Sequence, residues 1–326
     1  MRIKTLSVVL ALAFGSAAVG QAHAQEYPTR PITFIVPAPA GGAVDAVARL
    51  FANEMSRQMG QPVVIENKPG AGGILALQAT ARAAPDGYTV LVTHSSPIIN
   101  TPHLYASVPY DVRRDFAFVS QLCVGNLVLA VGADVPARDV KGLLAWANTN
   151  KGKVSYGSYG QGTYAHLVGA YLSRNRNLDM AHVPYKGEAP MAQDIAGGAL
   201  TWGVASLVAL RPYLDSGKVR PLAVMGNVRA KSLPDVPTMA EAGFTEPEFT
   251  PAGWIGMLAP AKTPQPVLAR LEKEARAAAQ SAAVKTRLAT YSLEPVGSAA
   301  AQFRREFETT EPVVARLIQS SGAKAD

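Results

Sequence analysis

Two stretches rich in glycine and small polar residues could bind a negatively charged ligand. The first, residues 37–45 (PAPAGGAVD), follows an apolar run at residues 32–36, and the second is residues 157–163 (GSYGQGT). Each precedes a run with the apolar spacing of a helix, and the first turn of a helix offers free N–H groups and a partial positive charge. Taken alone, the first stretch slightly favours an ordinary strand-to-helix turn over an anion site.

Motifs for catalysis or for nucleotide binding are missing. A nucleophile elbow needs the pattern G-x-S-x-G, but the run around Ser158 is YGSYG, in which tyrosine replaces the first glycine. The chain has no H-E-x-x-H motif, no cysteine pair and no P-loop, and its first loop is not G-x-G-x-x-G. We therefore expect no enzyme activity, no metal and no cofactor.

A repeated strand–loop–helix rhythm positions these loops. Strands are predicted at residues 32–36, 63–66 and 88–93, with helices at 44–59 and 74–83, which favours a parallel sheet with crossover helices. Ligands gather at the carboxyl ends of such strands, so the loop at residues 94–97 should lie near the first loop.

The rhythm restarts after two apolar strands at residues 116–122 and 127–132. A strand at 154–156 leads through the second glycine-rich loop into a helix at 164–173, for which Thr163 is the predicted N-cap. Further strands are predicted at residues 180–185, 200–205 and 219–225. The remaining chain is predicted to be helical, at 264–279, 281–291 and 299–320, and to pack on the first domain.

The pattern predicts two domains with two chain crossings. Residues 25–124 together with 252–326 would form the first domain, and residues 125–251 the second. A ligand cleft would lie between them, because domain interfaces are common places for small-molecule sites. Two facing helix N-termini would make the anion-binding interpretation much stronger than one did.

The N-terminus reads as a signal peptide over residues 1–24. Arg2 and Lys4 precede a short apolar core at residues 8–14, and Ala22, His23 and Ala24 form an A-x-A cleavage signature. The apolar run is too short for a transmembrane helix. We expect export to the periplasm with cleavage after Ala24.

Charge and cysteine content argue against nucleic-acid binding and exclude an internal disulfide. The formal net charge is +7, but the basic residues are scattered, which indicates mild attraction for anions and argues against nucleic-acid binding. Cys123 is the single cysteine, so an internal disulfide is impossible and stability depends on burial.

The chain resembles the Bug family of periplasmic solute receptors, the substrate-binding subunits of tripartite tricarboxylate transporters. The resemblance is carried by residues 30–32 (RPI), 37–45, 64–73 (which include the run ENKPGAGG), 85–89 (PDGYT), 156–163, 182–187 (HVPYKG), 233–244 and 254–260, in this order. It implies an α/β fold: a two-domain Venus-flytrap periplasmic binding protein of type II topology, each domain a mixed sheet flanked by helices. It further implies a monomer that binds a small carboxylate (a dicarboxylate, an aromatic acid or an amino acid) and delivers it to transporter membrane subunits.

The resemblance also implies the contact residues. Those of the first domain are Pro39, Ala40, Gly41, Gly42, Asp45, Ser95 and Ser96; those of the second are Ser158, Gly160, Gln161, Gly162, Thr163 and Ser206. Asp45 would support the loop or reach the ligand through water. Ser206 stands where many relatives carry Asn or Asp and could touch the distal end of the ligand. His94 could bind a second carboxylate if protonated.

Two alternatives stay open. A receptor of this kind could pass ligand occupancy to a signalling partner instead of a transporter, and an exported hydrolase is the rival from another class.

Overall fold

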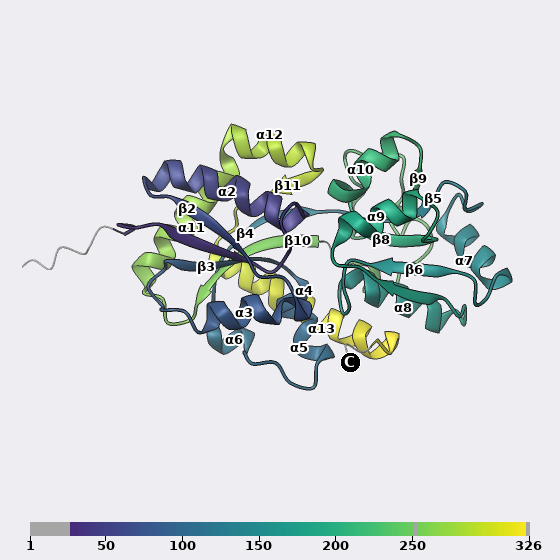
Figure 1. Cartoon of the computed structure of the whole chain (residues 1–326), viewed down its shortest axis with the longest axis horizontal. Helices are drawn as coiled ribbons and strands as arrows, with labels where there is room; N and C mark the ends of the chain where they lie inside the picture. Colours follow the sequence, from purple (N-terminus) through teal and green to yellow (C-terminus); the bar gives the residue numbers. More distant parts are fainter. Residues whose placement is uncertain (1–26, 251–252, 324–326) are drawn as a thin grey trace, which may run out of the picture.

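The computed structural model describes residues 27–250 and 253–323. Each of two mixed sheets is flanked by helices (Figure 1). The predicted signal peptide and its cleavage point after Ala24 lie outside the described residues, as does the predicted boundary between residues 251 and 252.

The six-stranded sheet of the first domain has the order β11-β4-β10-β3-β1-β2. Its strands are β1 (Ile32–Val36), β2 (Val63–Asn67), β3 (Thr89–His94), β4 (Phe116–Gly125), β10 (Gly253–Pro260) and β11 (Leu293–Pro295). β1 runs parallel to β2 and β3, whereas β10 runs antiparallel to β3 and β4. The parallel arrangement expected from the rhythm therefore holds for the first three strands, and the strands at the chain crossings make the sheet mixed.

The five-stranded sheet of the second domain has the order β7-β6-β8-β5-β9. Its strands are β5 (Leu127–Gly132), β6 (Ser155–Ser158), β7 (Ala181–Pro184), β8 (Trp202–Ser206) and β9 (Val219–Val224). β6 is parallel to both β7 and β8, and β5 is antiparallel to β8 and β9.

Helices cover both sheets. Those of the first domain are α2 (Ala43–Met59), η1 (Ala71–Gly73), α3 (Ile74–Ala81), α4 (Ser96–Ile99), α5 (Thr101–Leu104), α6 (Val112–Asp115), α11 (Gln265–Gln280), α12 (Ala282–Thr290) and α13 (Ala300–Ser321). Those of the second are α7 (Val140–Thr149), α8 (Tyr164–Asn175), α9 (Glu188–Ala196), α10 (Leu207–Asp215) and η2 (Pro247–Phe249).

Two local expectations were wrong. The stretch at residues 94–97 is not a loop, because His94 ends β3 and Ser96 begins α4, in whose first turn Pro97 needs no N–H partner. The C-terminal part is not entirely helical either. Leu293–Pro295 forms β11 against β4, and a strand of three residues is too short to show a period of two.

The chain passes between the sheets twice. β4 ends at Gly125 and β5 begins at Leu127; the return runs from η2 to Gly253 at the start of β10. The division into residues 25–124 with 252–326 and residues 125–251 agrees with this path and is our proposal for the domain boundaries.

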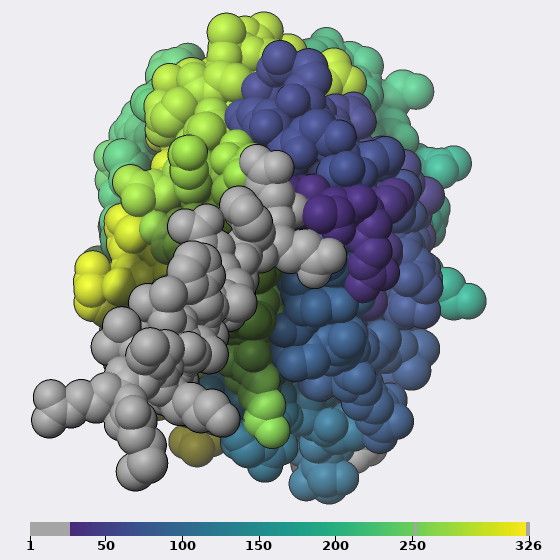
Figure 2. Space-filling model, turned by 90° about the vertical axis from the view of Figure 1, so that its left-hand side faces the viewer, coloured from purple at the N-terminus to yellow at the C-terminus, as the bar shows by residue number. Residues whose placement is uncertain are grey.

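The C-terminal helices pack on the first domain as expected, and one of them also reaches the second. The buried face of α2 meets α11 and α12 in one apolar cluster, so N- and C-terminal segments lie side by side at the end of the first domain (Figure 2). α13 packs on β4 through Phe303, whose ring lies 5.1 Å from that of Phe118, and it also packs along α8 (Figure 1).

Candidate functional site

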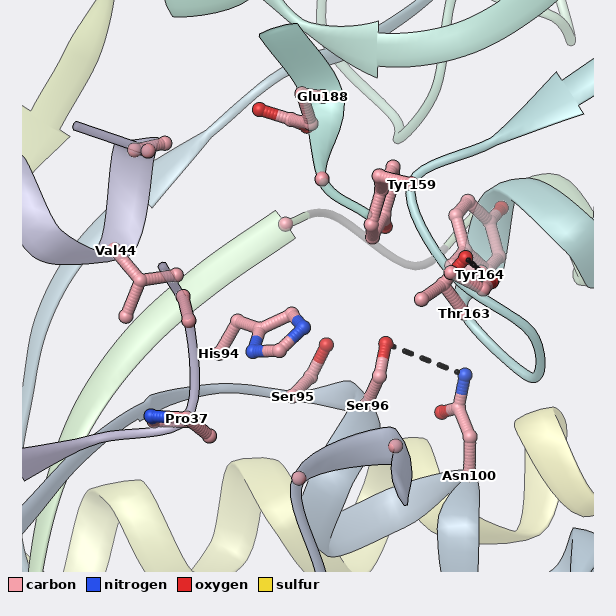
Figure 3. A pocket seen from close by; sticks show the side chains of 18 of the residues that line it. Pro37, Val44, His94, Ser95, Ser96, Asn100, Tyr159, Thr163, Tyr164 and Glu188 are labelled. Carbon is pink, nitrogen blue, oxygen red and sulfur yellow. Dashed lines mark hydrogen bonds between the residues drawn. The ribbon is translucent and has the colours of Figure 1, made fainter. Parts of the chain in front are cut away.

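A cavity of about 740 Å³ lies between the two domains. Its wall includes Pro39 and Gly42 before α2, Ser96 at the start of α4, and Thr163 before α8. Figure 3 shows side chains from both domains pointing into this space, with His94, Ser95 and Ser96 on one side and Glu188 and Tyr159 on the other.

The N-terminus of α2 opens on the cavity without a side-chain cap. Its N-cap is Gly42, which has no side chain to occupy the first N–H groups of the helix. Gly41 has a φ of +86°, a conformation that costs other residues energy. The first N–H groups of α2 and the positive end of its dipole are therefore at the wall of the cavity.

Asp45 uses both carboxylate oxygens to hold this loop. Oδ2 accepts hydrogen bonds of 2.9 Å from the N–H of Gly41 and from Arg49, and Oδ1 accepts one of 2.9 Å from Asn67. Burial alone would raise the pKa of Asp45, but these hydrogen bonds outweigh it and hold the pKa below its usual value. The carboxylate of Asp45 is thus occupied by donors of its own loop and of its neighbours Arg49 and Asn67.

The N-terminus of α8 is uncapped too, although its N-cap is the predicted Thr163. The Thr163 hydroxyl makes no bond to the helix and instead donates to the carbonyl of Gly160 at 2.7 Å. The first N–H groups of α8 are therefore left without a cap from Thr163. Thr163 and its neighbours Gly160, Gln161 and Gly162 all line the cavity.

Ser158 lies behind this loop rather than in the cavity wall. Its side chain is fully buried and donates to the Gly160 carbonyl, and its Oγ lies 2.8 Å from Nε2 of His182. The His182 ring stacks on that of His166 at 3.9 Å, and Nδ1 of His166 accepts from the N–H of Gly162. A serine next to a histidine is the contact a hydrolase would need, but here the pair braces the loop and does not face the cavity.

His94 contributes a neutral ring to the cavity. Its Nδ1 is buried and has no hydrogen-bond partner, and burial lowers the pKa of His94 to about 4. Without a bound anion the imidazole is uncharged at neutral pH. It can then donate or accept a hydrogen bond, whereas charge attraction to a second carboxylate would first require protonation.

Ser206 is engaged by a residue that the sequence analysis did not select. Glu188, the first residue of α9, accepts hydrogen bonds from the N–H and the hydroxyl of Ser206 at 3.0 and 2.5 Å. Both residues line the cavity. Burial raises the pKa of Glu188, and the two hydrogen bonds from Ser206 oppose that rise.

The two domains touch at the edge of the cavity. Nδ2 of Asn100, which follows α4, donates to the carbonyl of Gly162 at 3.0 Å. Gly162 has a φ of +74°, and a Cβ there would lie 2.6 Å from Leu104 of the first domain. The positive φ favours glycine at this position, and any other side chain would also have to displace the end of the Leu104 side chain.

The cavity brings together most of the residues selected from the sequence. Those in its wall are Pro39, Gly42, Ser95, Ser96, Gly160, Gln161, Gly162, Thr163 and Ser206, and those outside the wall are Ala40, Gly41, Asp45 and Ser158. Asn100, Tyr159, Tyr164 and Glu188 line it as well but were not selected. Their only sequence signal was proximity to the glycine-rich stretches or to a predicted strand end.

Within the described residues, no cluster of three or more histidine, cysteine or acidic side chains could hold a metal ion. Over the same residues, no helix combines the length and the apolar character that a membrane span requires.

Comparison with known proteins decides the family. Residues 47–322 match the family model described as tripartite tricarboxylate transporter family receptor. The chain belongs to this receptor family. The match spans both domains, and the family is one of periplasmic binding proteins.

Similar receptors are known in sequence and in structure. BugT of Bordetella pertussis is 32% identical over 326 residues, covering 99% of both chains. An R. palustris protein solved with adipate is 30% identical with a TM-score of 0.85, over 91% of this chain and 99% of that one. MatC from Rhodopseudomonas palustris with bound malate is 31% identical with a TM-score of 0.79, over 88% and 100%.

Proposed function

We propose that this chain is a periplasmic receptor that binds a small carboxylate between its domains and delivers it to the membrane subunits of a tripartite tricarboxylate-type transporter. The observation that carries the proposal is the convergence of two uncapped helix N-termini, those of α2 and α8, on one cavity. Each comes from a different domain. A carboxylate held there satisfies donors from both domains at once, so ligand binding favours the closed arrangement.

The chemistry of the cavity supports a carboxylate over a catalytic reaction. Closure excludes water, and hydrogen bonds from N–H groups to a carboxylate are stronger in such a site. Ser158 is buried against His182 and does not reach the cavity, which removes the best candidate for a nucleophile. We propose that the chain binds its ligand and releases it unchanged.

Export and assembly complete the proposal. Residues 1–24 would direct the chain to the periplasm and be removed after Ala24, and the mature receptor would be a monomer. Mass spectrometry of the periplasmic form gives its N-terminus, and light scattering on a sizing column gives its mass.

A thermal-shift screen tests carboxylate binding. Mature protein freed of co-purified ligand is heated with dicarboxylates, aromatic acids and amino acids, and with the methyl ester of each acid as a matched control. Binding to the folded state alone stabilises it by about 2.7 kcal/mol at a ligand concentration of 100 Kd. We expect a raised melting temperature for one class of acids and none for its esters. Equal shifts with acids and esters, or none with any acid, would overturn the proposal.

Delivery has a separate test. Cells that carry the membrane subunits should take up the ligand found in the screen only when this receptor is present. Recovery of the ligand from the receptor with unchanged mass checks that no hydrolysis takes place. Uptake that does not depend on the receptor, with binding intact, would point to the signalling alternative.

A further inference from the structure

The cavity contains a carboxylate that belongs to the protein. Of the acidic side chains in the described part of the chain, only Glu188 is part of the cavity wall. It enters from the second domain, opposite His94, Ser95 and Ser96 of the first (Figure 3). A receptor for anions thus has a negative group inside its own site, and this group needs an explanation.

Glu188 is held in place by a neutral partner. Both hydrogen bonds that the structure gives it come from Ser206, through the backbone N–H and the hydroxyl, and these fix one lone pair of each carboxylate oxygen. Lys186, a second-domain residue two positions before it, also belongs to the cavity wall, but its side chain is exposed. Glu188 is partly buried, and a carboxylate withdrawn from water is costly unless a cation or enough hydrogen bonds compensate it.

The position of Glu188 affects its own pKa and that of a neighbouring tyrosine. Burial raises the pKa of Glu188 despite the two hydrogen bonds from Ser206. The charge of Glu188 in turn contributes to the raised pKa of the nearby Tyr159 hydroxyl, after burial. Beyond the partial positive charge of the α9 N-terminus, no cation of the described residues is among the groups that act on the pKa of Glu188. A positively charged group brought there by a ligand would therefore gain a direct attraction.

We propose that Glu188 is a specificity-determining residue that selects an amino-carboxylate ligand, whose carboxylate lies on the helix N-termini of α2 and α8 and whose ammonium group pairs with Glu188. This inference rests on the proposed function and names the class of ligand within it. The same residue acts against a dicarboxylate, because a second carboxylate near Glu188 would meet a like charge in a site that excludes water. Ser206 serves as a positioning residue that keeps the Glu188 carboxylate aimed into the cavity.

Ligands that share a carboxylate but differ in their second group test the role of Glu188 separately from that of the helix N-termini. Carboxylates of two to eight carbons are presented in three forms: the plain monoacid, the α,ω-diacid, and the amino acid with its amine on the α or the terminal carbon. Affinities are measured by calorimetry for the wild type and for Glu188→Gln, which keeps an oxygen that can accept from Ser206. Glu272→Gln, which removes an acidic side chain paired with Arg276 on α11, is the control.

In the wild type we expect the amino acid of the best length to bind at least about tenfold tighter than the matching monoacid, and the diacid to bind weakest. Glu188→Gln should reduce the preference for the amino acid over the diacid by at least about tenfold, whereas Glu272→Gln should leave that preference unchanged. The assignment is overturned if diacids bind better than amino acids in the wild type. It also fails if Glu188→Gln leaves the ratio of the two affinities unchanged.

The monoacid series distinguishes failure of this inference from failure of the proposed function. If acids bind in any form but their order does not depend on Glu188, the receptor proposal stands and the role of Glu188 is wrong. If no acid in any form binds to folded, ligand-free protein, both are wrong. Thermal unfolding of Glu188→Gln without ligand verifies that the variant is folded.

Discussion

The side chain of Asn100 donates a hydrogen bond of 3.0 Å to the carbonyl of Gly162, and this bond joins the two domains beside the cavity. Asn100 is buried in this arrangement. Because the bond crosses from one domain to the other, a hinge motion that opened the cleft would break it.

Removing this bond should weaken ligand binding through closure. We expect Asn100→Ala to lower affinity by about fivefold, because a net hydrogen bond contributes about 1 kcal/mol, and to do so mainly by faster ligand release. Stopped-flow measurements of binding and release check this. Asn175→Ala, which removes an exposed asparagine bonded to the Tyr171 carbonyl, is the matched control. A loss confined to the association rate would contradict the closure role.

The hydroxyl of Thr163 should matter for affinity. If it rotates from Gly160 to a bound carboxylate, Thr163→Ala costs about 1–2 kcal/mol of binding free energy, whereas Thr163→Ser retains most of it. Thr309→Ala, on the exposed face of α13, should have no effect. Calorimetry with the ligand from the carboxylate screen measures all three, and equal affinity of the alanine variant and the wild type would exclude the contact.

Asp45 should contribute to stability more than to direct ligand contact. In Asp45→Asn the new amide must face one of the donors Gly41, Arg49 or Asn67, so we expect a loss of about 1–3 kcal/mol in urea unfolding at pH 7. Asp86→Asn, which affects an exposed ion pair with Arg30, should cost less than about 1 kcal/mol.

The carboxylate of Asp45 should also make the stability of the protein fall in strong acid. The pKa of Asp45 is lowered in the folded state, so its contribution is fully present above its unfolded pKa of about 3.9 and is lost as pH falls through the folded value. In Asp45→Asn this part of the acid sensitivity should be absent. A variant with the wild-type slope of stability against pH below pH 4 would contradict this role.

Three histidines should make the protein acid-sensitive at milder pH. Burial lowers the pKa of His94, His166 and His182 to about 4 each, with His166 adding to the shift of His182. The unfolded chain binds these protons near pH 6.5 and the folded chain does not, so stability is full above about pH 6.5 and falls towards pH 4. Each histidine adds at most about 1.4 kcal/mol per pH unit to the slope, and partial exposure reduces the share of His182.

Urea unfolding at pH 7.5, 6, 5 and 4.5 measures this slope. The raised pKa of Glu188 acts in the opposite direction, since its contribution to stability is present at low pH and is lost as pH rises through the folded value. His166→Gln should flatten the fall between pH 6.5 and 4. An unchanged slope in this variant would show that His166 takes up its proton in the folded state.

Sequence patterns predicted most of the framework. The apolar periodicity located β1 and α2, and Thr163 was correctly identified as the N-cap of α8. Patterns of two and 3.6 residues could not reveal β11, which exists because Leu293–Pro295 finds an unpaired edge of β4. Such pairing is a property of the assembled fold and not of the segment.

The site was less accessible to prediction than the fold. Glycine-rich loops indicated where backbone donors would gather, and residues from both loops do line one cavity. The sequence analysis did not select Glu188, because nothing in its own neighbourhood indicates that Ser206, at the end of β8, would hold its carboxylate at the cavity wall. Ser158 was selected through the family resemblance. The four-residue strand that it ends leaves the direction of its side chain undetermined by sequence.

The donors at the starts of α2 and α8 are peptide N–H groups, and this affects how such a receptor can change over generations. A single substitution, unless it introduces proline, leaves a peptide N–H in place. Under the proposed function, the donors that hold the carboxylate therefore survive most substitutions, apart from those at glycines with positive φ such as Gly41 and Gly162. Choice of the rest of the ligand depends on side chains such as Glu188, where one codon change alters charge. New specificities can therefore arise without loss of the old anchor.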